Sequence, residues 1–116
     1  MKKKSSSSLI VLNSDLITKV ISELGNKNFT FIMNLIEELH PADTADLLET
    51  LNSEDRKKVV KIIKENFPSE TLPSMNVPIL LDIIEEFEIS HLVRMLSELD
   101  TDDITYVLEI CEEKLR

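Results

Sequence analysis

The sequence predicts an all-α protein, a superhelical solenoid of about seven or eight short helices stacked as helix pairs. Three observations lead to this prediction. Only one glycine and four prolines occur among the 116 residues, which favours helices joined by short polar connections over a sandwich of strands. No alternation of apolar and polar residues lasts long enough to indicate a strand. Finally, a capped-helix phrase recurs along the chain, as in proteins built from helical repeats.

The recurring phrase combines a capping residue, an acidic first turn and a paired apolar step. Its first copy is His40-Pro-Ala-Asp-Thr-Ala-Asp-Leu-Leu-Glu49, and its second is Asp100-Thr-Asp-Asp-Ile-Thr-Tyr-Val-Leu-Glu109. A looser third copy is Asn52-Ser-Glu-Asp-Arg-Lys-Lys-Val-Val60. Each copy predicts one short helix. Stacked short helices expose surfaces that bind partners, so the pattern points to a binding function.

Capping residues and apolar stripes of helical period justify the elements one by one. Gly25 is expected to end the first helix. His40 is expected to cap the third, with Pro41 at its first position. Pro73 is expected to end a short helical turn. The predicted helices span 15–24, 29–39, 41–50, 53–64, 69–72, 76–87, 89–99 and 101–114.

The predicted core is the set of apolar positions on these stripes. Cys111 takes such a position, so we expect it to be buried, reduced and unreactive, as suits a reducing cytosol. The predicted core residues are Leu16, Ile17, Val20, Ile21, Leu24, Phe29, Ile32, Met33, Leu35, Ile36, Leu39, Ala45, Leu47, Leu48, Leu51, Val59, Val60, Ile62, Ile63, Leu80, Leu81, Ile83, Ile84, Phe87, Leu92, Val93, Met95, Leu96, Leu99, Ile104, Val107, Leu108, Cys111 and Leu115.

The chain is expected to form one domain over residues 13–116, preceded by a flexible lead over residues 1–12. The lead is basic, but its four apolar residues are too few for a signal peptide. No apolar run approaches the roughly 20 residues that cross a bilayer. We therefore expect a cytoplasmic segment without direct membrane insertion.

The net charge of −9 is distributed unevenly. Residues 1–68 carry ten acidic and ten basic side chains, whereas residues 69–116 carry twelve acidic and three basic ones. An acidic half repels nucleic acid and anionic lipid, and it favours cations or a basic partner. Solubility alone is the ordinary alternative explanation. Aromatic residues make up only 4% of the chain, so base stacking is poorly served and no nucleic-acid partner is expected.

The residues that catalysis needs are missing from the sequence. There is no Gly-x-Ser-x-Gly turn, and one glycine cannot build a phosphate-binding loop. His40, His91 and Cys111 do not have the spacing of a zinc site. We therefore expect a protein that is not an enzyme.

Carboxylates form the candidate site. Asp100, Asp102 and Asp103 crowd one helix start, and Glu70 stands at a break between helices. Such hard oxygen ligands suit Mg²⁺ or Ca²⁺, although the spacing is not that of an EF-hand. Helix capping and solvated charge are the alternative readings of Asp102 and Glu70.

The stretch Leu39-His-Pro-Ala-Asp-Thr-Ala-Asp-Leu-Leu-Glu-Thr-Leu51 carries a family resemblance. Together with Asp55-Arg56, Val59-Val60 and Leu99-Asp-Thr-Asp-Asp103, it resembles the cytoplasmic N-terminal domain of MgtE-type magnesium channels. The resemblance extends over residues 15–114. It implies a superhelix of short helices that precedes a pair of CBS domains and a membrane channel that is a homodimer. In that family, Mg²⁺ bound between this domain and the CBS domains favours the closed channel.

The resemblance also implies roles for single residues. Glu70 and Asp102 fall at family positions that give carboxylates to the interface with the CBS domains. Some relatives carry a further acidic ligand where this chain has Tyr106, so Asp103 or Asp100 would have to substitute with a different geometry. The implied cofactor is weakly bound Mg²⁺, shared with the partner domain. Repeats of the flagellar motor-switch protein have a similar style, so a protein-interaction scaffold without ion dependence is the alternative function.

Overall fold

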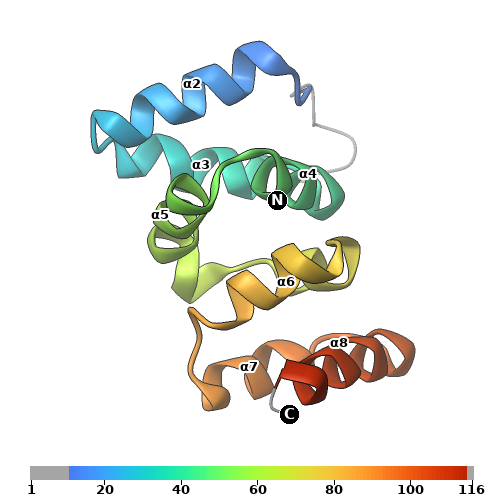
Figure 1. The fold of residues 1–116 in the computed structure, drawn as a ribbon. Coiled ribbons are helices and arrows are strands. Elements are labelled where there is room, and N and C mark those ends of the chain that lie inside the picture. Colours follow the sequence, from blue (N-terminus) through green and yellow to red (C-terminus); the bar gives the residue numbers. More distant parts are fainter. Residues whose placement is uncertain (1–10, 115–116) are drawn as a thin grey trace.

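The structure, a computed structural model, describes residues 11–114. Its helices follow one another in chain order from one end of the molecule to the other (Figure 1), and its principal extents are 38 × 32 × 22 Å. All regular structure in this part of the chain is helical, which confirms the all-α prediction. The superhelical stacking of helix pairs stays a prediction. Most of the expected lead (residues 1–10) and Leu115 lie outside the described residues.

Seven α-helices and two 3₁₀ helices occur between residues 11 and 114. The α-helices are α2 (Ser14–Gly25), α3 (Phe29–Glu38), α4 (Pro41–Thr50), α5 (Ser53–Ile63), α6 (Val77–Ile84), α7 (Ile89–Leu96) and α8 (Thr101–Lys114). The 3₁₀ helices η1 (Lys64–Asn66) and η2 (Ser69–Ser74) connect α5 to α6. Within residues 11–114, no helix combines the length and the apolar character needed to cross a membrane.

Side-chain caps set the start of most α-helices, as the sequence predicts. Asn13, Asn28, Asn52 and Asn76 each accept a hydrogen bond from the backbone N–H three residues ahead. His40 caps α4 through Nδ1, which accepts from the N–H of Ala42 at 3.1 Å. These bonds satisfy backbone donors that a helix leaves unpaired at its N-terminus. The repeated use of asparagine explains how short helices can start at defined residues.

The helices share one apolar core. α3 packs on α2 and α5, α4 packs on η2, and α8 packs on α6 and η2. Leu47, Leu48 and Val59 are at most 1% exposed, and Leu72 and Leu80 are fully buried. The short break at residues 69–74 is therefore held between α4 and α8, where it forms part of the core and carries Glu70 to the surface.

Five residues predicted in the core are exposed instead: Ile21, Phe29, Met33, Val93 and Leu108. Each lies at the edge of the apolar stripe of its helix, and a short helix packs only the middle of that stripe. Ile110, at the opposite edge on α8, is buried although it was not predicted. Cys111 is only partly buried, and burial raises the pKa of its thiol.

One predicted helix end is confirmed and three are corrected. Gly25 is the last residue of α2, as predicted, and the left-handed residue of the α2–α3 turn is Lys27, with φ 59°. Pro73 does not end the helical turn but lies inside η2. Proline lacks an N–H donor, but the hydrogen bonds of this short 3₁₀ helix are donated by Thr71 and Met75, before and after Pro73. The predicted helices 76–87 and 89–99 end earlier, at Ile84 and Leu96.

Arg56 is a buried charged residue that joins three helices. Its Nε donates to the Leu48 carbonyl and its Nη2 to the Leu51 carbonyl, both at 2.8 Å. Its Nη1 contacts Asp82 Oδ2 on α6 at 2.8 Å. The planar guanidinium can satisfy three acceptors at once. Arg56 on α5 thereby fixes the C-terminal end of α4 against α6, which is the centre of the stack.

Candidate metal centre

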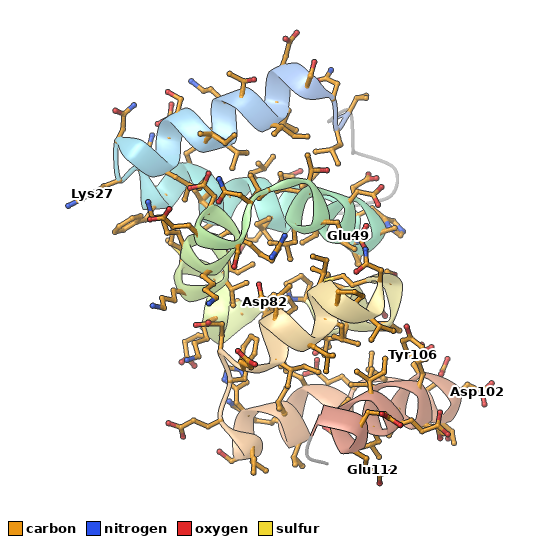
Figure 2. The ribbon with its side chains drawn as sticks, viewed as in Figure 1. Lys27, Glu49, Asp82, Asp102, Tyr106 and Glu112 are labelled. Carbon is orange, nitrogen blue, oxygen red and sulfur yellow. The ribbon has the colours of Figure 1, made fainter. Side chains whose placement is uncertain are left out.

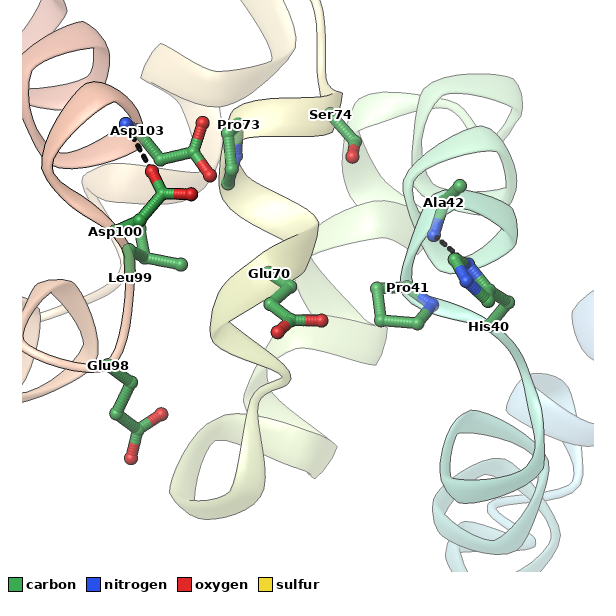
Figure 3. Close-up of a pocket in the computed structure, with 10 residues that line it drawn as sticks. All are labelled: His40, Pro41, Ala42, Glu70, Pro73, Ser74, Glu98, Leu99, Asp100 and Asp103. Carbon is green, nitrogen blue, oxygen red and sulfur yellow. Dashed lines mark hydrogen bonds between the residues drawn. The ribbon is translucent and has the colours of Figure 1, made fainter. Parts of the chain in front are cut away.

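An open pocket of about 340 Å³ brings most of the predicted carboxylates together. It lies where η2 passes between the start of α4 and the α7–α8 connection. Glu70, Asp100 and Asp103 line it, together with Glu98 and His40. Figure 3 shows Glu70 on η2 between the Asp100–Asp103 pair on one side and Pro41 with His40 on the other. Three of the four predicted site residues therefore share one concave surface.

Local hydrogen bonds hold the carboxylates of this pocket. Asp100 caps α8, since its Oδ1 accepts from the backbone N–H of Asp103 at 3.0 Å (Figure 3). The hydroxyl of Ser69 donates to Glu98 Oε1 at 2.8 Å. The Asp103 N–H and the Ser69 hydroxyl therefore hold the carboxylates of Asp100 and Glu98 without neutralising either of them. These two carboxylates are thus held in place at the pocket.

The pKa of Asp103 is raised above its ordinary value. The main cause is partial loss of solvation, and the negative charges of Asp100, Asp102 and Glu70 add to it. Each of these effects disfavours the ionised carboxylate. A cation at the pocket would relieve this repulsion. The pocket therefore places several negative charges close to one partly desolvated carboxyl.

Asp102 does not join the pocket, although it was a leading candidate in the sequence. It is exposed on α8, and its side chain is directed away from the molecule at the outer end of the helix (Figure 2). The next residue, Asp103, faces inward because one step along a helix turns a side chain by about 100°. Tyr106 is 37% exposed and does not line the pocket either.

Two residues of the pocket were not foreseen as site residues. Glu98 precedes the recurring phrase, and His40 was assigned only to helix capping. Both belong to the short connections before α8 and α4, the two helices that start with the same phrase. The repeat itself was the signal that could have found them, because equivalent connections of stacked repeats lie on one side of a stack.

The donor set fits a hard divalent cation in chemistry but is incomplete in geometry. Carboxylate oxygens are the ligands that Mg²⁺ prefers. Across residues 11–114, however, no three His, Cys, Asp or Glu side chains come close enough to hold a metal ion. An ion at this pocket would need further ligands from water or from another domain.

Comparison with known proteins identifies the family. The family model of the MgtE intracellular N domain matches residues 39–116. The chain belongs to this family. The match covers the whole acidic pocket, whereas all of α2 and α3 precede it. No curated protein and no solved structure matches the chain.

As an MgtE intracellular N domain, the chain is associated with magnesium transport and belongs to a regulatory domain family rather than to a family of enzymes. The pocket residues Glu70, Glu98, Asp100 and Asp103 all lie inside the matched segment of this MgtE domain. Its acidic surface therefore lies within the part of the chain that the family model describes.

Proposed function

We propose that this MgtE domain is a cytoplasmic Mg²⁺ sensor that supplies one half of a shared ion site, the other half coming from CBS domains of the same transporter chain. The observation that carries the proposal is the convergence of Glu70, Glu98, Asp100 and Asp103 at one pocket. The raised pKa of the Asp103 carboxyl supports it, since partial loss of solvation raises this pKa first and the negative charges of Asp100 and Glu70 raise it further.

The proposed mechanism is a competition between repulsion and bridging. When Mg²⁺ is scarce, the acidic pocket repels an acidic face of the CBS domains, and the two stay apart. When Mg²⁺ is plentiful, bound ions cancel the repulsion and are shared by both faces, so the docked arrangement gains population by mass action. In a homodimeric channel, this rigid-body docking would favour the closed state.

The test is a titration of the isolated domain with MgCl₂ at constant ionic strength, followed by ¹H–¹⁵N NMR. Shifts are expected around Glu70, Asp100 and Asp103, with a dissociation constant of about 1 mM or weaker because half of the ligands are absent. The double variant Glu70→Gln/Asp103→Asn should lose these shifts. Asp102→Asn and Glu109→Gln, which change exposed α8 residues outside the pocket, should keep them.

Micromolar saturation of the isolated domain would contradict the shared site, because it would mean that this chain holds the ion alone. Equal loss in Asp102→Asn and in the pocket variant would show a diffuse charge effect instead. The pairing with CBS domains is tested by adding those domains of the same transporter in trans. Their affinity for this domain should rise with Mg²⁺ and fall with EDTA.

The alternative function is a helical protein-interaction scaffold that ignores ions. The exposed apolar side chains Phe29 and Met33 on α3 favour a protein contact of this kind. Binding of the CBS domains of the same transporter that is equal in Mg²⁺ and in EDTA would favour the scaffold over the sensor.

A further inference from the structure

A groove between α3 and α5 lies away from the acidic pocket and has the opposite charge. Its larger part, about 330 Å³, has an apolar floor formed by Leu24, Phe29 and Ile62. Lys27, Lys58 and Lys61 stand around it. A smaller hollow of about 50 Å³ follows, between Met33, Ile36 and Glu37 on α3 and Ile63 with Asn66 beyond the end of α5.

The two hollows are lined on one side by α3, at residues one helical turn apart, and on the other side by α5 and the 3₁₀ helix η1 that follows it. Phe29 and Met33 are four residues apart on α3, and Ile62 and Asn66 are four residues apart on the other wall. One turn of an α-helix is about 5.4 Å. Two apolar side chains at positions i and i+4 of a helix have this same spacing. The groove therefore matches an amphipathic helix laid along it, a common mode of peptide recognition.

Two large apolar side chains on the α3 side of the groove, Phe29 and Met33, are left exposed by the other described residues. Phe29 is 49% exposed and Met33 is 40% exposed, although both belong to the helical apolar pattern. Large apolar side chains gathered at a hollow mark a contact surface more often than isolated ones do. The lysine stems can extend this apolar surface while their ammonium groups stay in water.

The three lysines of the groove have no acidic partner within residues 11–114. The acid nearest to Lys27 in sequence, Glu23, is already bound to Lys19 at 2.9 Å and to Asn28 at 3.0 Å. Glu54 and Glu65 lie four residues from Lys58 and Lys61 on the same chain, but neither forms an ion pair with them. The groove is thus a basic site on an acidic protein, and it complements an acidic ligand.

We propose that this groove binds an acidic amphipathic helix of a protein partner, with its apolar side chains at i and i+4 in the two hollows and its carboxylates over Lys27, Lys58 and Lys61. Glu37 stands at the far hollow, so the acidic turn of the helix lies at the lysine end. Leu24, Lys27, Phe29 and Met33 precede the segment matched by the MgtE family model. The proposal is independent of the Mg²⁺ site.

The probe is a synthetic helical peptide of about 14 residues with leucines four apart and glutamates beside one of them. Its binding to the full chain is measured by fluorescence anisotropy in EDTA, and its site is mapped by NMR. We expect saturable binding with shifts at Phe29 and Ile62. Lys58→Gln/Lys61→Gln should weaken it about tenfold, as should glutamine for glutamate in the peptide. Lys57→Gln/Lys64→Gln, which removes the same charge from residues that line neither hollow, is the matched control.

Three outcomes would overturn the proposal. The first is no saturation up to about 1 mM peptide, or equal binding by the groove and control variants. The second is binding to phosphatidylglycerol vesicles that needs Lys58 and Lys61 while the peptide does not bind, which would assign the groove to a membrane surface. The third is self-association of the chain that is lost in Lys58→Gln/Lys61→Gln, which would make a second copy the occupant. Because the assay contains EDTA, its failure leaves the Mg²⁺ proposal intact.

Discussion

The contrast between Asp103 and Asp102 shows that one step along a helix decides whether a carboxylate lines the acidic pocket. It is one residue from Asp102, has the same chemistry, and yet only Asp103 lines the acidic pocket. Its neighbour across the connection, Asp100, both caps α8 and adds a negative charge beside it. Helix capping and a role in an ion site are therefore compatible for this acidic cluster, because Asp100 caps α8 while the Asp103 side chain lines the pocket.

The pH dependence of Asp103 is the prediction at this scale. Because its pKa is raised in the folded state, the folded protein binds a proton before the unfolded chain does as the pH falls. As the pH falls through the raised pKa toward the ordinary value of 3.8, protonation of Asp103 therefore increases the free energy of unfolding. At neutral pH, where Asp103 is ionised, this contribution is lost. NMR titration of the Asp103 carboxyl should give a pKa above 3.8.

The variant Asp100→Asn separates the causes. Asparagine keeps the cap but removes the neighbouring charge, so the pKa of Asp103 should move down toward its ordinary value. Mg²⁺ should also lower it if the ion binds at this pocket. An Asp103 pKa that is unchanged by both would contradict the electrostatic description of the site.

At the scale of the elements, Arg56 is the residue whose loss should matter most. Arg56→Ala would leave two backbone carbonyls without the guanidinium, and Asp82 with only the 3.4 Å hydrogen bond from the Ser53 hydroxyl, at the junction of α4, α5 and α6. We expect the free energy of unfolding to fall by about 3 kcal/mol. Arg56→Lys should lose about half of that, since it keeps the charge but not the planar fork. Urea denaturation followed by circular dichroism measures both.

The control for this prediction is Lys58→Ala, two residues away on the exposed side of α5. It should change the free energy of unfolding by no more than about 0.5 kcal/mol. A loss below about 1 kcal/mol for Arg56→Ala would mean that water replaces the guanidinium, so that the junction does not depend on it.

Sequence patterns predicted the elements well and their edges less well. Capping by Asn28 and His40 has a local cause, since each side chain bonds within its own chain segment. The exposure of Phe29 and Val93 depends on which neighbour reaches the edge of the stripe, and no local pattern contains that information. For the same reason, the local sequence predicted Asp102 as a site residue although it does not line the pocket. Glu98 lines the pocket only because η2 packs on α4 and α8, and the sequence did not predict it.

At the scale of the whole molecule, the charge distribution sets the response to salt. The nine net negative charges come from residues 69–116, so the C-terminal half repels itself at neutral pH. Added NaCl should raise the melting temperature, because the screening length is about 10 Å at 0.1 M ionic strength. MgCl₂ at equal ionic strength should raise it further, through binding at the acidic pocket.

The comparison of the two salts is made in the wild-type chain and in Glu70→Gln/Asp103→Asn. The extra effect of MgCl₂ over NaCl should disappear in the variant, while the NaCl effect should persist. A melting temperature that depends only on ionic strength in both proteins would place the Mg²⁺ response outside this pocket.

No connection between consecutive helices exceeds four residues from α2 to α8, and the single glycine of the chain lies inside α2. The short connections and the Arg56 junction leave few places between residues 11 and 114 where a hinge could form. We therefore expect the region where α4, η2 and α8 meet to move together with α2 as one body. A partner bound at the lysine groove would then change position together with the acidic pocket when this domain docks or undocks.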